Sequence, residues 1–102
     1  RPACACQIET GHLQGKSVWT VEALAGDAHG VQLLASFERL QAAQCGFCTS
    51  GILMRAQALL RETPLPTREA VMAALAPHLC RCGAQPRIID AVMDATPPRE
   101  AP

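Results

Sequence analysis

Two pairs of closely spaced cysteines restrict what this chain can fold into more than any other feature of its sequence. Cys45 and Cys48 form a Cys-x2-Cys motif, Cys80 and Cys82 form a Cys-x-Cys motif, and 31 residues lie between the pairs. A fold that brings both pairs together creates a site with four thiolate ligands, which suits zinc or an iron–sulfur cluster. The spacing therefore predicts a metal centre and leaves the choice of metal open.

Other uses of these cysteines have to be weighed from the residues alone. The six cysteines could form the disulfide bonds of a secreted protein, although Cys80 and Cys82 are too close to bond each other comfortably. A four-cysteine zinc site would make the chain a structural interaction module without redox activity. The segment from Cys45 to Cys48 could also be a thiol oxidoreductase motif, but the βαβ pattern of that class is missing and the second pair would have no role.

The composition favours a small helical domain. The 102 residues are 49% hydrophobic but include only two phenylalanines, one tryptophan and no tyrosine, so Leu, Ala, Val and Ile must form the core. The formal net charge of zero, without a basic block, does not support binding to nucleic acid or to an anionic membrane surface. No apolar run approaches the roughly 20 residues of a membrane span. No signal peptide is visible in this sequence, which starts without a methionine. The location that we expect is cytoplasmic.

Helical spacing of apolar residues predicts four helices after the N-terminal quarter of the chain. Asp27 can cap the first helix and Thr67 the third, since both side chains accept hydrogen bonds from helix N–H groups. Either Thr49 or Ser50 can cap the second helix, directly after the first cysteine pair. Pro86 suits the first turn of the last helix. The expected spans are residues 27–43, 49–63, 67–77 and 86–94.

The two ends of the chain do not look like complete structural units. The segment from Ser17 to Val21 has the β-branched and aromatic content of a short strand, but a strand without a partner is only marginally stable. Cys4 and Cys6 lie close together upstream, and each could be a free thiol. Residues 96–102 contain three prolines and are expected to form a disordered tail.

Two motifs resemble those of a known family. The sequence Gln-Cys-Gly-Phe-Cys-Thr-x-Gly, which begins at Gln44, and the sequence Leu-Cys-Arg-Cys, which begins at Leu79, resemble the [2Fe–2S] helical domain of the molybdenum hydroxylases. These are the relatives of xanthine dehydrogenase, aldehyde oxidoreductase and carbon monoxide dehydrogenase. The resemblance covers roughly residues 15–95 and implies a [2Fe–2S] cluster. Its implied ligands are Cys45, Cys48, Cys80 and Cys82.

The resemblance implies an all-α fold, in which two helical hairpins make a four-helix arrangement with the cluster at one end. Residues 1–25 would be the tail of a plant-type ferredoxin-like domain with its linker, and residues 26–95 the helical cluster domain. The segment from Val18 to Leu24 is similar to the family's Thr-Thr-Val-Glu-Gly-Leu segment. Counting back from it makes Cys6 the fourth ligand of a second cluster, whose other three ligands are absent.

The implied function is electron transfer within a molybdenum-containing oxidoreductase, in which this chain is not catalytic on its own. Electrons would pass from the molybdenum–pterin centre through this cluster to a second [2Fe–2S] cluster and then to FAD. The implied partner subunits are a large one that binds molybdenum and a medium one that binds FAD, or equivalent domains. In this family the glutamine before the first cysteine pair and the last cysteine contact the pterin, which indicates Gln44 and Cys82 here.

The residues around the cysteines suit a buried negative cluster. Gly46 and Gly83 would let the backbone approach sulfur closely or adopt a positive φ angle, and the following helices would supply N–H donors. Two positions depart from the family pattern. His78 stands where asparagine is usual, and we interpret it as a surface or packing residue. The segment from Gly83 to Pro86 stands where the family commonly has Thr-Gly-Tyr, so a tyrosine contact is lost.

Overall fold

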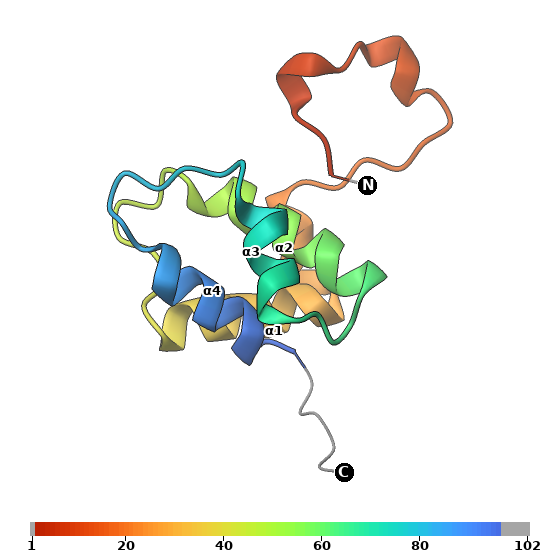
Figure 1. Ribbon diagram of the computed structural model, residues 1–102. Helices are drawn as coiled ribbons and strands as arrows, with labels where there is room; N and C mark the ends of the chain where they lie inside the picture. The colour runs from red at the N-terminus through yellow and green to blue at the C-terminus, as the bar shows by residue number, and fades with distance from the viewer. Residues whose placement is uncertain (1, 97–102) are drawn as a thin grey trace.

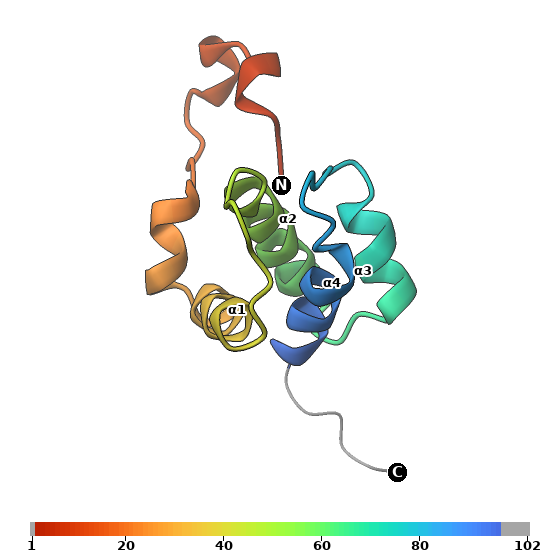
Figure 2. The same ribbon diagram turned by 90° about the vertical axis from the view of Figure 1, so that its left-hand side faces the viewer.

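The computed structural model describes residues 2–96, which form four α-helices and three short 3-10 helices and contain no β-strand. The α-helices are α1 (Ala28–Arg39), α2 (Thr49–Glu62), α3 (Arg68–Leu75) and α4 (Gln85–Asp94). The 3-10 helices η1 (Ala5–Gln7), η2 (Thr10–Leu13) and η3 (Val21–Gly26) precede them. Both α2 and α4 pack against α1 and α3 (Figures 1 and 2). The all-α class is therefore confirmed, while its division into two hairpins stays a prediction.

Two of the four described α-helices begin at side-chain caps that the sequence predicts. The Oδ2 atom of Asp27 accepts a hydrogen bond of 2.9 Å from the N–H of Gly30 at the start of α1. The Oγ1 atom of Thr67 accepts one of 3.1 Å from the N–H of Ala70 at the start of α3. Each bond satisfies a backbone N–H that has no partner inside the helix.

The first helix is shorter than expected. The predicted end at Ala43 is wrong, because α1 ends at Arg39. Gln41 then adopts a left-handed φ of 52°, and the N–H of Ala42 donates to the carbonyl of Phe37 over 3.0 Å. This Schellman arrangement closes the helix and turns the chain towards the cysteines. The usual sequence signal for it is a glycine, and glutamine occupies that position here.

The core consists mainly of aliphatic side chains from all four α-helices of the described chain. Phe37 is the one aromatic residue in it, with 6% of its surface exposed. Buried Ser36 on α1 donates a hydrogen bond of 2.7 Å to Asp94, the last residue of α4. The buried apolar residues are Leu24, Leu33, Phe37, Ala42, Ile52, Leu53, Ala56, Leu60, Val71, Leu75, Ala84, Ile88, Ala91, Val92 and Ala95.

The segment from Ser17 to Val21 has the composition of a strand but does not form one. Residues 17–20 have no regular secondary structure, and Val21 already belongs to η3. The described part of the chain offers no second strand with which this segment could pair, and a single strand does not hold itself together. Trp19 is instead fixed from one side, because the guanidinium of Arg61 on α2 lies 4.8 Å from the centre of its ring.

The helical body begins with η3, which packs against α1 and α2. Leu24 on η3 is 1% exposed, and its carbonyl oxygen would lie 2.2 Å from a Cβ atom built on Gly30. This close approach explains a glycine in the first turn of a helix, where its low helix propensity is otherwise unfavourable. The domain division expected at residues 25 and 26 stays a prediction.

The N-terminal segment with η1 and η2 stands away from the helical body in both views (Figures 1 and 2). At the other end, the tail expected at residues 96–102 lies outside the described residues, apart from Thr96. Among the described residues, no helix has both the length and the apolar character that crossing a membrane requires.

Candidate metal centre

The four cysteines of the two motifs lie in two loops at the same end of the helical body. Cys45 and Cys48 belong to the connection between α1 and α2, and Cys80 and Cys82 to the connection between α3 and α4. The two connections run beside each other (Figures 1 and 2). Cys45 is exposed, whereas the other three thiols are half-buried. The fold thus brings together the four residues that the sequence singled out.

Each cysteine of the first loop faces one cysteine of the second. The side chain of Cys82 helps to lower the pKa of Cys45, and the side chain of Cys80 helps to raise the pKa of Cys48, so each thiol of the first loop lies near one thiol of the second. Burial, followed by the contact with Cys80, raises the pKa of the Cys48 thiol. This crosswise pairing depends on the path of both loops, and the spacing of the cysteines in the sequence does not reveal it.

Backbone N–H groups point at two of the sulfurs. The N–H of Ala84 is the main cause that lowers the pKa of Cys80, against the opposing effect of burial. The N–H of Phe47 is the main cause that lowers the pKa of Cys45. Because N–H donors stabilise a thiolate more than a thiol, both loops are suited to hold negative charge.

The two helices that begin beside the cysteines lack side-chain caps. Cys48 is the N-cap residue of α2 and Ala84 that of α4, and neither side chain accepts a hydrogen bond there. The expected cap by Thr49 or Ser50 is therefore wrong, since α2 begins at Thr49 itself. In α1 and α3, which begin elsewhere, the cap is present. The first-turn N–H groups of α2 and α4, with the positive ends of the helix dipoles, remain available to the sulfurs.

Two glycines shape the cysteine loops as the sequence predicts. Gly46 has a φ of 82° and Gly83 a φ of 70°, both in the left-handed region where other residues are strained. Each glycine sits directly beside a cysteine, so the turn it makes directs neighbouring N–H groups towards sulfur. The N–H of Gly83 is among the causes that lower the pKa of Cys80.

The thiols form two pairs, and they do not form one closed cage. Within residues 2–96, no three His, Cys, Asp or Glu side chains converge on a point that could hold a single metal ion. All six cysteines are free thiols. Cys4 and Cys6 are exposed on the N-terminal segment, where Cys6 belongs to η1. The role of Cys6 in a second cluster stays a prediction.

The rim of the site has features that sequence reasoning missed. Phe47 and Leu79, each next to a cysteine, are 94% and 84% exposed, more than any other large apolar residue that the structure describes. Motif position alone does not show that a phenylalanine or a leucine faces solvent. The imidazole of His78 packs near the first turn of α2, since a Cβ atom on Gly51 would lie 3.4 Å from its Nδ1.

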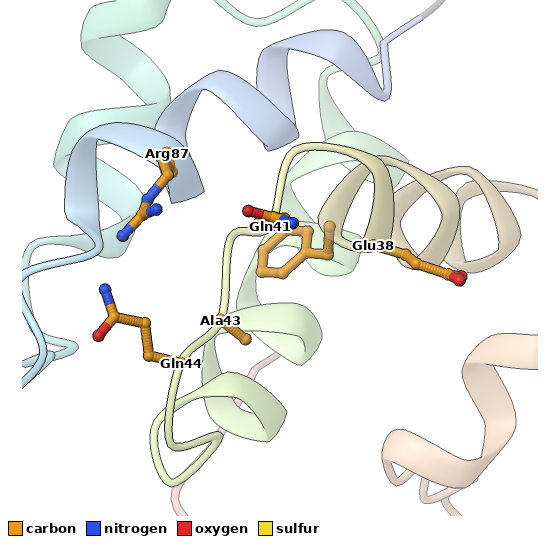
Figure 3. A pocket seen from close by; sticks show the side chains of 6 residues that line it. Glu38, Gln41, Ala43, Gln44 and Arg87 are labelled. Atoms are coloured by element: carbon orange, nitrogen blue, oxygen red, sulfur yellow. The ribbon is translucent and has the colours of Figure 1, made fainter.

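Gln44 lines an open groove beside the first cysteine pair. The groove lies between the end of α1 and the first turn of α4 and has a volume of about 520 Å³. Figure 3 shows the amide of Gln44 and the guanidinium of Arg87 pointing towards each other, while Glu38 points away. Nothing in the sequence pattern distinguishes Gln41 and Arg87 from ordinary surface residues. The lining residues are Phe37, Glu38, Gln41, Ala43, Gln44 and Arg87.

The fold and the site define a small helical domain that presents four cysteines in two facing pairs at one end. Residues 20–93 match the family model described as "[2Fe-2S] binding domain". The chain therefore belongs to the [2Fe-2S] binding domain family. The match confirms the resemblance that the cysteine motifs indicated.

Relatives of this chain are parts of oxidoreductases. It is 48% identical over 91 residues to the nicotine 6-hydroxylase small subunit of Paenarthrobacter nicotinovorans, covering 89% of this chain and 54% of that protein. It is 36% identical over 81 residues to the nicotinate dehydrogenase small FeS subunit of Eubacterium barkeri, covering 79% of this chain and 52% of that protein. A crystal structure of quinoline 2-oxidoreductase from Pseudomonas putida 86 superposes with a TM-score of 0.78 at 39% identity. That alignment covers 90% of this chain and 57% of the other. The chain thus spans little more than half of the length of these relatives.

Proposed function

We propose that Cys45, Cys48, Cys80 and Cys82 hold a [2Fe–2S] cluster. The meeting of the two cysteine loops at one end of the helical body carries this proposal, together with the family match over residues 20–93. A [2Fe–2S] centre with four cysteines takes two sulfurs on each iron, and the two facing pairs supply two sulfurs each. The N–H groups of Phe47 and Ala84 and the uncapped starts of α2 and α4 would offset the negative charge of the cluster.

A structural zinc site is the second candidate from the sequence. Zinc takes all four sulfurs around one point, and within residues 2–96 no three thiols are arranged around such a point. The family match supports the cluster as well. A visible absorption spectrum, together with an electron paramagnetic resonance spectrum after dithionite reduction, distinguishes a [2Fe–2S] cluster from a zinc site. A protein with the cluster is coloured and gives an electron paramagnetic resonance signal when it is reduced. A protein with zinc is colourless and gives no such signal.

The bound cluster would supply one-electron transfer. We place the chain in the electron-transfer subunit of a molybdenum hydroxylase, between a molybdenum–pterin centre and a second [2Fe–2S] cluster with FAD. The names of the relatives support a small subunit of a larger enzyme. The large molybdenum-binding and medium FAD partners, the cytoplasmic location, and the lack of a nucleic-acid or membrane partner all belong to this proposal.

Gln44 and Cys82 are proposed to contact the pterin. Gln44 is exposed, and its amide both donates and accepts hydrogen bonds, which suits the edge of a pterin ring. In the reassembled enzyme, Gln44→Ala should leave the cluster spectrum intact and slow the reduction of the cluster by substrate. Gln32→Ala, which removes an exposed amide from α1, is the matched control. Wild-type reduction rates in Gln44→Ala, with normal assembly, would contradict the contact.

A further inference from the structure

We propose that Gln41 and Arg87, in the groove between the end of α1 and the first turn of α4, bind an aspartate or glutamate side chain of the partner chain that covers the cysteine end. The inference rests on the proposed function in one respect, namely that a partner covers this end. It adds the chemistry by which that partner is recognised. The groove lies directly beside the cysteines, because Gln44 precedes Cys45.

Arg87 supplies a positive charge that residues 2–96 do not neutralise. In residues 2–96, Arg87 has no hydrogen bond or ion pair, and the one acidic lining residue, Glu38, points away from it (Figure 3). Four other arginines of the helical body do have partners in the chain. They are Arg39 with Asp94, Arg55 with the carbonyl of Ala74, Arg61 with Trp19, and Arg68 with Asp90.

Gln41 supplies an amide at a position where the backbone favours glycine. It is the one non-glycine residue with a positive φ, 52°, among the residues that the structure describes. A glycine would end the helix at less conformational cost. Strained residues of this kind are concentrated at functional sites, and Gln41 lines the groove together with Arg87 (Figure 3). We infer that the side chain of Gln41 takes part in binding the partner.

These groups match a carboxylate. A guanidinium presents several N–H donors in a plane and binds carboxylates with two parallel hydrogen bonds, and amide N–H groups can add further bonds. The surroundings indicate that the carboxylate belongs to a protein. Phe47 and Leu79, beside the same cysteines, are 94% and 84% exposed, as in surfaces that another chain covers.

The test uses the complete iron–sulfur subunit together with its molybdenum-binding partner, and measures the dissociation constant at several salt concentrations. Arg87→Gln should weaken association about tenfold and make it less sensitive to salt. Arg68→Gln removes the same charge from the start of α3, where it pairs with Asp90, and should bind like wild type. Equal affinity and equal salt dependence of Arg87→Gln and wild type would overturn the inference.

The variant Gln41→Gly tests the binding role of the amide independently of the stability of the fold. Because glycine relieves the strained backbone, this variant should melt at the same or a higher temperature, yet associate several-fold more weakly with the partner. Unweakened association would contradict a binding role for the amide. A third arm titrates the isolated subunit with acetate and inorganic phosphate. Binding of these ions at the groove, with association unchanged in Arg87→Gln, would assign the groove to a free anion and overturn the partner assignment.

The absorption spectrum of the cluster shows whether a negative result rejects this inference or the proposed function. Every variant should show the wild-type absorption spectrum, because none of the three substituted residues is a proposed cluster ligand. A wild-type subunit without an iron–sulfur spectrum would reject the proposed function. A normal spectrum with unaltered association would reject only the carboxylate site.

Discussion

The hydroxyl of Ser36 on α1 donates a hydrogen bond of 2.7 Å to the carboxylate of Asp94 at the end of α4. Ser36 is 3% exposed, and Arg39 pairs with the same carboxylate. These bonds fasten the first α-helix to the last. The cysteine loops precede α2 and α4, so a fixed position of α4 relative to α1 also holds the two loops beside each other.

Ser36→Ala should therefore destabilise the protein. Loss of a buried hydrogen bond to a charged group lowers the free energy of unfolding by about 1.5–3 kcal/mol. Urea denaturation followed by circular dichroism measures this change. Ser17→Ala removes an exposed hydroxyl from the N-terminal segment and should change the free energy by less than about 0.5 kcal/mol. Equal changes in the free energy of unfolding for the two substitutions would show that the hydrogen bond of Ser36 does not contribute to stability.

Gly30→Ala should be the more damaging of two neighbouring glycine substitutions. The new Cβ atom would lie 2.2 Å from the carbonyl oxygen of Leu24, and that oxygen belongs to the backbone and cannot rotate away. Overpacking of this kind costs about 1–3 kcal/mol or more. Gly26→Ala is the control, because nothing lies within 4 Å of its new Cβ atom. Similar melting temperatures for the two variants would contradict the close packing of η3 on α1.

The helices could be predicted from the sequence because their signals are local. Asp27 and Thr67 mark the starts of α1 and α3, and the apolar spacing marks the buried faces. The end of α1 could not be predicted, since a glutamine at a glycine position leaves no local signal. Residues 17–21 have the composition of a strand but do not form one, because β propensity needs a partner strand, and such a partner is a property of the whole fold.

The sequence singles out the residues of the candidate site, but it does not show how they are arranged. Cysteine spacing and the family motifs identify Cys45, Cys48, Cys80 and Cys82. Which thiols face each other depends on two loops that meet only in the folded chain. The groove beside Gln44 was missed for the same reason, because Arg87 reaches it from the start of α4.

Asp27 should make stability depend on pH in the acid range. The N–H of Gly30 lowers the pKa of its carboxyl, against the opposing effect of burial. A carboxyl whose pKa is lower in the folded state contributes fully above its unfolded pKa, and its contribution is lost as the pH falls through the folded pKa. The free energy of unfolding should thus decrease below about pH 4. Asp27→Asn keeps a capping oxygen and should flatten this decrease in urea denaturation. An unchanged profile would show that Asp27 is not responsible.

Mild oxidation of the metal-free protein should reveal the facing pairs. Because Cys45 lies against Cys82 and Cys48 against Cys80, disulfides should form between the two loops. Peptide mapping by mass spectrometry identifies them. In urea, where the loops separate, a bond between Cys45 and Cys48 should appear instead. A bond between Cys45 and Cys48 as the main product in the folded protein would contradict the crosswise arrangement.

The content of iron and acid-labile sulfide after anaerobic reconstitution tests the central claim most directly. With Cys45, Cys48, Cys80 and Cys82 as the complete ligand set, the 102-residue chain should bind about two irons and two sulfides. Cys48→Ala should lose both, and Cys4→Ala should keep both. One zinc per chain without sulfide, or an iron content near four, would contradict a single [2Fe–2S] cluster at this site.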